Sequence, residues 1–317
     1  GGEQYWHGLL GHDGRAGRRY REAAQVAREY HRLEKHLDGT TVKPRVAIIY
    51  DYDSLWATRI QPGYRGNDYR DRVARYYEAL FRAGVNVDMA PAGGDLSRYK
   101  LVFAPGLYVL PDHVAAKLCT YVRAGGTLLC DGRTAVKDAT GLCHERTLPG
   151  RLSPALGVRI EEYESIADDT AYTVPVSDTL GGPYRASNGA DWVKVGKATR
   201  VAGYGEWHMR PYAAVTRHRY GKGYGWYAGT VIREPQFYDT LVAALLKDAR
   251  VRAPVSPPEG VEVSVRQGKG KRLLFLVNHT EEKRTAKVPK GKRELISGKT
   301  TRATLELDRH GVAVVKL

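Results

Sequence analysis

The sequence is poor in cysteine, with three cysteines among 317 residues. A sparse, odd number of cysteines is typical of a protein in a reducing cytoplasm and argues against a disulfide scaffold. Cys119, Cys130 and Cys143 have no Cys-x-x-Cys spacing, so we expect no zinc site and no other metal. No apolar run approaches the ~18 residues of a membrane span. We therefore expect a cytoplasmic protein without a membrane partner.

Motifs that hold phosphates are also missing. The first apolar strand pattern, residues 45–50, is followed by Asp51, Tyr52 and Asp53 instead of a glycine-rich loop. Neither G-x-G-x-x-G nor a P-loop follows it, and two aspartates would repel a phosphate. We therefore expect no dinucleotide, ATP or other cofactor.

The α/β region has no recognisable nucleophile. Class I glutamine amidotransferases share the sheet predicted below, but they need a cysteine at a sharp turn between a strand and a helix. The strand pattern at 101–105 leads into Gly106, Leu107 and Tyr108, and no G-x-S-x-G elbow is present. We therefore expect no catalytic residue in this region.

Positive charge exceeds negative charge, with 50 Lys+Arg against 35 Asp+Glu and a formal net charge of +15. The excess is spread along the chain, and its densest part is the strand-rich tail, where 261–317 carries 14 basic and 6 acidic residues. Lysine-rich turns keep sheet edges from pairing with other chains. The charge therefore predicts a surface property and no specific nucleic-acid partner.

Apolar periodicity predicts a helix over 18–37, with no obvious packing partner, and then a region of alternating strands and helices. Unbroken apolar strands separated by helices indicate a parallel, doubly wound sheet of the flavodoxin or class I glutamine amidotransferase type. The strands are expected at 45–50, 85–90, 101–105 and 127–131, and the helices at 68–83 and 111–124.

The rest of the chain is less regular. We expect a short helix at 152–158, a closing helix at 233–249 and a proline-rich linker at 253–258. Residues 260–317 contain short strand patterns and no helix pattern, which predicts a small β-sandwich-like domain of ~5–7 strands. Four further strands are expected at 171–176, 192–195, 213–219 and 225–229.

A predicted loop over 55–67 is the main candidate for a functional surface. It carries Trp56, Arg59, Tyr64 and Asn67. Aromatic, arginine and asparagine side chains suit sugar stacking with hydroxyl hydrogen bonds, and they equally suit a polar protein–protein interface. We favour the interface.

Several segments, taken in chain order, are distinctive as a set. They read EQYWHGLLGHDG and RRYRE (3–14, 18–22), VAIIYDYD and WA (46–53, 56–57), LVFAP, VRAGGTL and LGV (101–105, 122–128, 156–158), and FLVNH and GVAV (275–279, 311–314). Together they resemble the β-galactosidases of glycoside hydrolase family 42. The resemblance implies the last loop and helix of a (β/α)8 barrel at 1–44, an α/β trimerisation domain at 45–252 and a C-terminal β domain at 259–317.

The resemblance also implies what the chain does. The family hydrolyses terminal β-D-galactosides by a retaining mechanism with two glutamates, and both would lie upstream of Gly1 on a barrel of about 250 residues. We therefore expect a chain that is inactive alone and forms a homotrimer. The trimer would bring the loop at 56–67 near a neighbouring active site.

Three residues near the start are candidate substrate-binding residues through the same resemblance. Glu3 matches a family glutamate that hydrogen-bonds the sugar. The family has a histidine three residues after it, where this chain has Trp6, which could stack on the sugar, and His7 follows one residue later. The alternative is a free-standing, non-catalytic module that binds a carbohydrate or another small ligand in a cleft lined by Asp51, Asp53 and Trp56.

Overall fold

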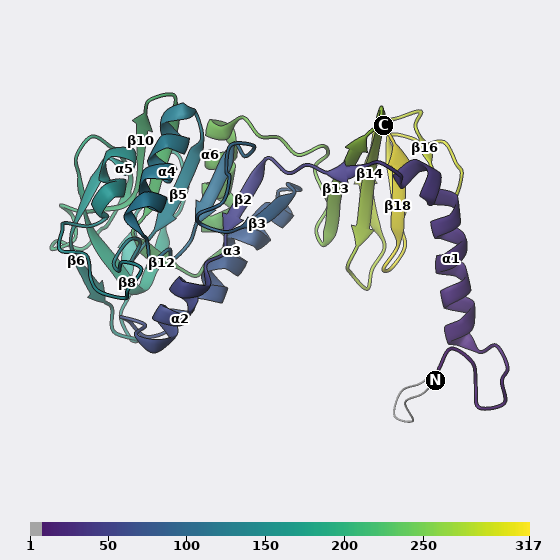
Figure 1. Ribbon diagram of the computed structural model, residues 1–317, viewed down its shortest axis with the longest axis horizontal. Coiled ribbons are helices and arrows are strands. Elements are labelled where there is room, and N and C mark those ends of the chain that lie inside the picture. Colours follow the sequence, from purple (N-terminus) through teal and green to yellow (C-terminus); the bar gives the residue numbers. More distant parts are fainter. Residues whose placement is uncertain (1–7) are drawn as a thin grey trace. The chain divides into compact units, whose positions relative to one another are not determined.

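The computed structural model describes residues 8–317. The chain forms two compact units, which we describe separately (Figure 1). The larger is Pro44–Ala253, and the smaller joins Gly1–Lys43 to Pro254–Leu317.

A row of parallel strands forms the centre of the larger unit. Its order is β11-β5-β4-β2-β3, and every neighbouring pair in this row is parallel. The three central strands are buried along their whole length, which is why they read as unbroken apolar runs. The expected strands are confirmed to within two residues. Their bounds are β2 (Val46–Ile49), β3 (Val87–Ala90), β4 (Leu101–Ala104), β5 (Thr127–Asp131) and β11 (Gly223–Ala228).

The same sheet continues as an antiparallel part, so it is mixed and has eleven strands. The expected parallel sheet is therefore found only in the row β11-β5-β4-β2-β3. Strand β10 pairs antiparallel with β11 and with β8. Strand β9 pairs with β10, and β6, β7 and β12 pair with β8. These strands are β6 (Val158–Ser165), β7 (Tyr172–Val174), β8 (Tyr184–Val195), β9 (Thr199–Gly203), β10 (Ala213–Tyr220) and β12 (Thr230–Ile232).

Helices cover both faces of the sheet. One core contains α3 (Tyr69–Arg82) and α6 (Pro235–Ala249), and the other contains α4 (Asp112–Ala124) and α5 (Ser153–Leu156). A short 3-10 turn at Gly150–Leu152 precedes α5. The helix expected at 152–158 ends early because Gly157 adopts a φ of +69°, and β6 begins directly after it.

In the part of the small unit that the structure describes, there are two β-sheets and one helix. The strands of the first sheet follow the order β1-β13-β14-β18-β16, while β15 and β17 form the second. The expectation of a small all-β part is confirmed for 260–317. The strands are β1 (Thr41–Val42), β13 (Val261–Gly268), β14 (Lys271–Asn278), β15 (Arg284–Lys287), β16 (Arg293–Glu294), β17 (Thr304–Leu307) and β18 (Val312–Lys316).

Helix α1 (Arg18–Leu37) has the predicted bounds but, contrary to expectation, has a packing partner in the chain. Leu33 is buried in a cluster with Leu273, Leu295 and Val314. Further along, β1 pairs with β13. The helix is therefore held to the β-sheet at its carboxyl end, by contacts to residues more than 200 positions away that periodicity cannot reveal.

Candidate functional site

The segment expected to be a loop over 55–67 begins as a helix. Helix α2 spans Tyr52–Ile60 and follows β2 at the carboxyl edge of the parallel strands. The Asp51 carboxylate accepts a hydrogen bond from the Ser54 backbone N–H at 2.7 Å, which caps the helix. Apart from the buried Leu55, its large apolar residues face outward, so the pattern lacks the buried stripe by which a helix is recognised.

The outward side of α2 is apolar and largely exposed, with the ring centre of Tyr50 5.3 Å from that of Tyr52. Tyr52, Trp56 and Ile60 stand one turn apart and are 59%, 55% and 84% exposed. The ring centres of Tyr52 and Trp56 are 5.7 Å apart. Arg59 is exposed beside them. We call Tyr52, Trp56, Arg59 and Ile60 the α2 face.

Tyr64 and Asn67, in the segment after α2, point into the protein. Tyr64 is buried, and its ring lies so close to Gly189 that a Cβ there would be 2.7 Å away. Asn67 donates from Nδ2 to the Pro62 carbonyl at 2.6 Å, and its Oδ1 is buried without a hydrogen-bond partner in residues 8–317. These two residues stabilise the segment from inside, whereas Trp56 and Arg59 are on the surface.

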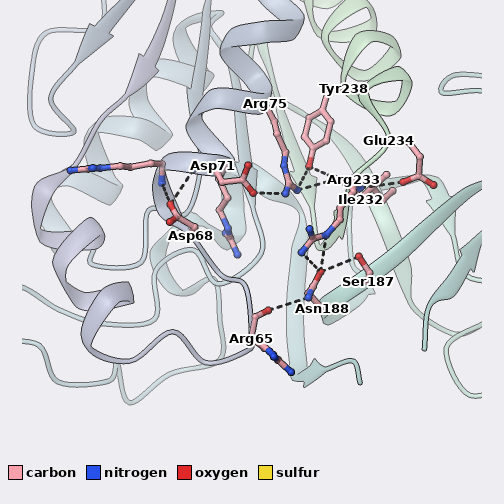
Figure 2. Close-up of polar contacts among 12 residues, drawn as sticks. Arg65, Asp68, Asp71, Arg75, Ser187, Asn188, Ile232, Arg233, Glu234 and Tyr238 are labelled. Carbon is pink, nitrogen blue, oxygen red and sulfur yellow. Dashed lines mark hydrogen bonds and ion pairs between the residues drawn. The ribbon is translucent and has the colours of Figure 1, made fainter. Parts of the chain in front are cut away.

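Figure 2 shows how the backbone of this segment is fixed to the sheet. Asn188 of β8 donates to the Arg65 carbonyl at 3.2 Å, and its Oδ1 accepts from Arg233 Nη2 at 3.0 Å and from Ser187 Oγ at 3.1 Å. Asn188 has a φ of +65°, a left-handed conformation that asparagine tolerates. The Arg65 side chain also forms an ion pair with Asp168.

A second contact in Figure 2 joins α3 to α6. Arg75 donates to the Tyr238 hydroxyl at 3.3 Å and to the Ile232 carbonyl at 3.2 Å, and it forms an ion pair with Asp71. Asp68 caps α3 by accepting from the Asp71 backbone N–H at 3.2 Å. Together with Asn188, these contacts hold the segment that follows α2 and the start of α3 in one position.

A buried charged pair lies beneath this segment, at the carboxyl ends of the strands. Arg72 donates to the Asp131 carboxylate at 3.2 Å, to the Gly132 carbonyl at 2.7 Å and to the Tyr64 hydroxyl. The Gly106 backbone N–H also donates to Asp131, at 2.6 Å. Burial raises the pKa of Asp131, and the charge of Arg72 opposes that shift. Arg72 thus joins the Tyr64 segment to the sheet.

Asp191 is a second buried acid close by. It accepts from the Arg133 backbone N–H at 3.1 Å and from the Tyr227 hydroxyl. Burial raises the pKa of Asp191, and these two hydrogen bonds oppose the shift. Sequence reasoning missed both acids and Arg72. One signal was available: Arg72 lies on the apolar stripe of a predicted helix, where a charged residue needs a buried partner.

The other predicted site residues are placed as follows. Glu3, Trp6 and His7 lie outside the described residues. Asp51 is the cap of α2, and neither it nor Asp53 nor Trp56 lines the cleft beside the ends of β4 and β5.

Two kinds of feature are absent from the described residues. Residues 8–317 contain no group of three or more His, Cys, Asp and Glu side chains arranged to hold a metal ion. None of the helices in this range combines the length and apolar character needed to span a membrane.

Both units match known families. Residues 44–252 match the β-galactosidase trimerisation domain, and residues 260–317 match the β-galactosidase C-terminal domain. Because both matched domains are domains of β-galactosidases, the chain falls into the class of glycoside hydrolases. The chain belongs to the β-galactosidases of glycoside hydrolase family 42.

Individual relatives agree with this assignment. The chain is 31% identical to β-galactosidase BgaA of Clostridium cellulovorans, with 100% of this chain and 48% of that protein covered. It is 33% identical to β-galactosidase BgaH of Haloferax lucentense, with 91% and 42% covered. The crystal structure of the β-galactosidase from Bacillus circulans sp. alkalophilus is similar with a TM-score of 0.92 at 27% identity, covering 99% of this chain and 47% of that one. The chain therefore spans about half the length of the relatives it matches.

Proposed function

We propose that the chain is the assembly-bearing part of a β-galactosidase and that it forms a homotrimer through the α2 face. The observation that carries this proposal is the exposed row of Tyr52, Trp56 and Ile60, on a helix whose following segment is fixed to the rest of the unit by hydrogen bonds. A preorganised apolar and aromatic patch with an arginine at its side has the composition of an interface centre. The trimerisation domain that the family description names is consistent with this role.

The same face would contact the active site of a neighbouring subunit. Trp56 offers an indole for stacking on a sugar, and Arg59 offers hydrogen-bond donors to hydroxyl groups. Tyr64 and Asn67 would hold the segment in place from within. In this proposal Glu3, Trp6 and His7 bind the galactoside of their own subunit.

The complete enzyme would hydrolyse terminal β-D-galactosides by the retaining mechanism, in which one glutamate is the nucleophile and a second is the acid and base. We propose that both belong to a barrel that is not part of this chain, so that the chain alone is inactive. Pure chain should leave a nitrophenyl β-galactoside intact. Robust hydrolysis would contradict the proposal.

Two finer points belong to the same proposal. The order β3-β2-β4-β5-β11 supports a flavodoxin-like origin for the parallel part of the sheet, because that fold uses the order 2-1-3-4-5. Cys119, Cys130 and Cys143 are all free, which supports a reducing cytoplasm as the location.

Light scattering during size-exclusion chromatography tests the assembly. We expect a trimer at micromolar concentration and a monomer for the double variant Trp56→Ser, Ile60→Ser, because the variant removes two anchors of the α2 face. The matched control is Trp207→Ser, which removes an indole that is 81% exposed and lies outside α2. A monomeric wild-type chain, or a double variant that stays trimeric, would refute the proposed interface.

A further inference from the structure

A cleft of about 650 Å³ opens beside the carboxyl ends of β4 and β5. Its walls come from the segments that follow these two strands, from β6 and from the segment 143–148. Ligands of doubly wound sheets bind outside the carboxyl ends of the strands, and cavities of this size hold small molecules. Tyr108, Tyr163, Val136, Leu148 and Ile160 supply its apolar lining.

Arg133, directly after β5, is the unusual residue of this cleft. It is only 8% exposed, and its guanidinium carbon lies 3.5 Å from the ring centre of Tyr163 and 5.6 Å from that of Tyr108. The two tyrosines hold the guanidinium by cation–π contact. Its Nε is buried without a hydrogen-bond partner, and within residues 8–317 the guanidinium forms neither a hydrogen bond nor an ion pair.

Within residues 8–317 no carboxylate forms a hydrogen bond with this guanidinium, and Asp191 interacts with it through its charge alone. The buried carboxylate of Asp191 is spent on the Arg133 backbone N–H and the Tyr227 hydroxyl. A buried cation without a hydrogen-bonded anion is costly, and ring contacts supply no hydrogen-bond acceptor in the guanidinium plane. What the site lacks is an anion that accepts hydrogen bonds from this guanidinium.

The other charged residues of the cleft define which anion fits. Arg146 forms an ion pair with Asp112 at 3.0 Å, and Arg159 forms one with Glu161 at 2.8 Å. Among the arginines of the described walls, Arg133 is therefore the one without an ion-pair partner. Glu161, Glu162 and Asp191 also line the cleft, so a doubly charged phosphate would meet more repulsion than a singly charged anion. A carboxylate carries one charge and matches the guanidinium fork.

We propose that this cleft binds a small monocarboxylate whose carboxyl group pairs with Arg133 and whose body packs on Tyr108, Val136 and Ile160. Carboxylate binding at this site requires neither trimer formation nor galactoside hydrolysis. The proposal can therefore be tested independently of the function proposed above.

Isothermal titration calorimetry on the full 317-residue chain tests the site. Sodium D-galacturonate and sodium benzoate are the carboxylate probes, and D-galactose and inorganic phosphate are the comparisons, all at one ionic strength. We expect one equivalent of at least one carboxylate to bind. D-Galactose and phosphate should each bind at least tenfold more weakly. Failure of both carboxylates to bind, or equal binding of galacturonate and galactose, would overturn the proposal.

Variants assign the binding to Arg133. Arg133→Gln should weaken carboxylate binding at least tenfold, and Arg133→Lys should fall between it and the wild type because it keeps the charge and loses the fork. Arg146→Gln is the matched control, since it removes a cation from the same cleft and should leave affinity within threefold. Equal affinity of wild type and Arg133→Gln would refute the assignment. If Arg133→Gln does not fold, the selectivity of the wild type among the four probes still decides the matter.

Discussion

At the scale of single residues, Arg72 has the most consequential contacts. Its guanidinium reaches the Tyr64 hydroxyl, the Asp131 carboxylate and the Gly132 carbonyl. Both side chains of the Arg72–Asp131 pair are 9% exposed. Each partner is therefore shielded from the water that could replace the other.

Replacing Arg72 with methionine should lower the free energy of unfolding by about 3–5 kcal/mol, because it leaves a buried carboxylate without its cation. The control is Arg98→Met, which breaks the pair with Asp88, where Arg98 is 67% exposed, and should cost less than about 1 kcal/mol. Urea unfolding of both variants measures the difference. Similar losses in the two would contradict the structural role of the buried pair.

The raised pKa of Asp191 predicts how the stability of the protein changes with pH. Burial raises the pKa of Asp191 in the folded protein above the 3.8 expected of the unfolded chain. The folded state therefore holds this proton more tightly, so the contribution of Asp191 to stability falls as pH rises from about 4 through the folded pKa. Asp191→Asn has no such titration. Its stability relative to wild type should rise with pH in this window, as measured by urea unfolding at several pH values, and a constant difference would contradict the prediction.

At the scale of elements, the segment after α2 depends on close contact between the Tyr64 ring and β8. Gly189→Ala would place a methyl group 2.7 Å from that ring. We expect a loss of about 1–3 kcal/mol, because the ring has to move, and faster proteolysis within 61–68. Gly93→Ala is the control, since no atom lies within 4 Å of a Cβ there. Equal stability of the two variants would show that Tyr64 is not fixed by β8.

Helix α1 offers a second test at this scale. Leu33→Ala should destabilise the small unit by about 2 kcal/mol, since it removes the buried anchor of the helix on β14 and β18. Val26→Ala, at a position that is 51% exposed, should have little effect. Hydrogen exchange of the α1 amides reports the result, and unchanged protection in Leu33→Ala would contradict the packing.

At the scale of the whole molecule, sequence reasoning succeeded where one residue pattern determines one element. The buried strands β2, β4 and β5 and the bounds of α1 and α3 were predicted, since continuous apolar runs and apolar residues at helical spacing are local signals. Strand β6 and most of β8 were missed, because much of β6 is exposed and Asn188 interrupts β8 with a left-handed residue. Of the α2 face, Trp56 and Arg59 were among the predicted residues, although on a loop, and Tyr52 and Ile60 were not, because the apolar side of this helix faces outward.

Contacts that join distant parts of the chain could not be predicted. Arg72 meets Asp131 across 59 positions, and Asn188 meets the Arg65 carbonyl across 123. The position of Arg72 on an apolar stripe indicates that it needs a buried partner, but nothing in the sequence says which residue that partner is. These pairings depend on the register and order of strands, which periodicity does not encode.

The small unit is assembled from two segments with Pro44–Ala253 inserted between them. Thr40 and Arg266, which are hydrogen-bonded through the Thr40 carbonyl, stand 226 positions apart. During synthesis, β1 therefore cannot pair with β13 until β13 has left the ribosome. By then the whole inserted α/β unit has been synthesised. Domains fold as units as they emerge, so the α/β unit should fold first and hold the two segments within reach. Pairing β1 with β13 then costs less conformational entropy than it would if residues 44–253 were an unfolded loop between them.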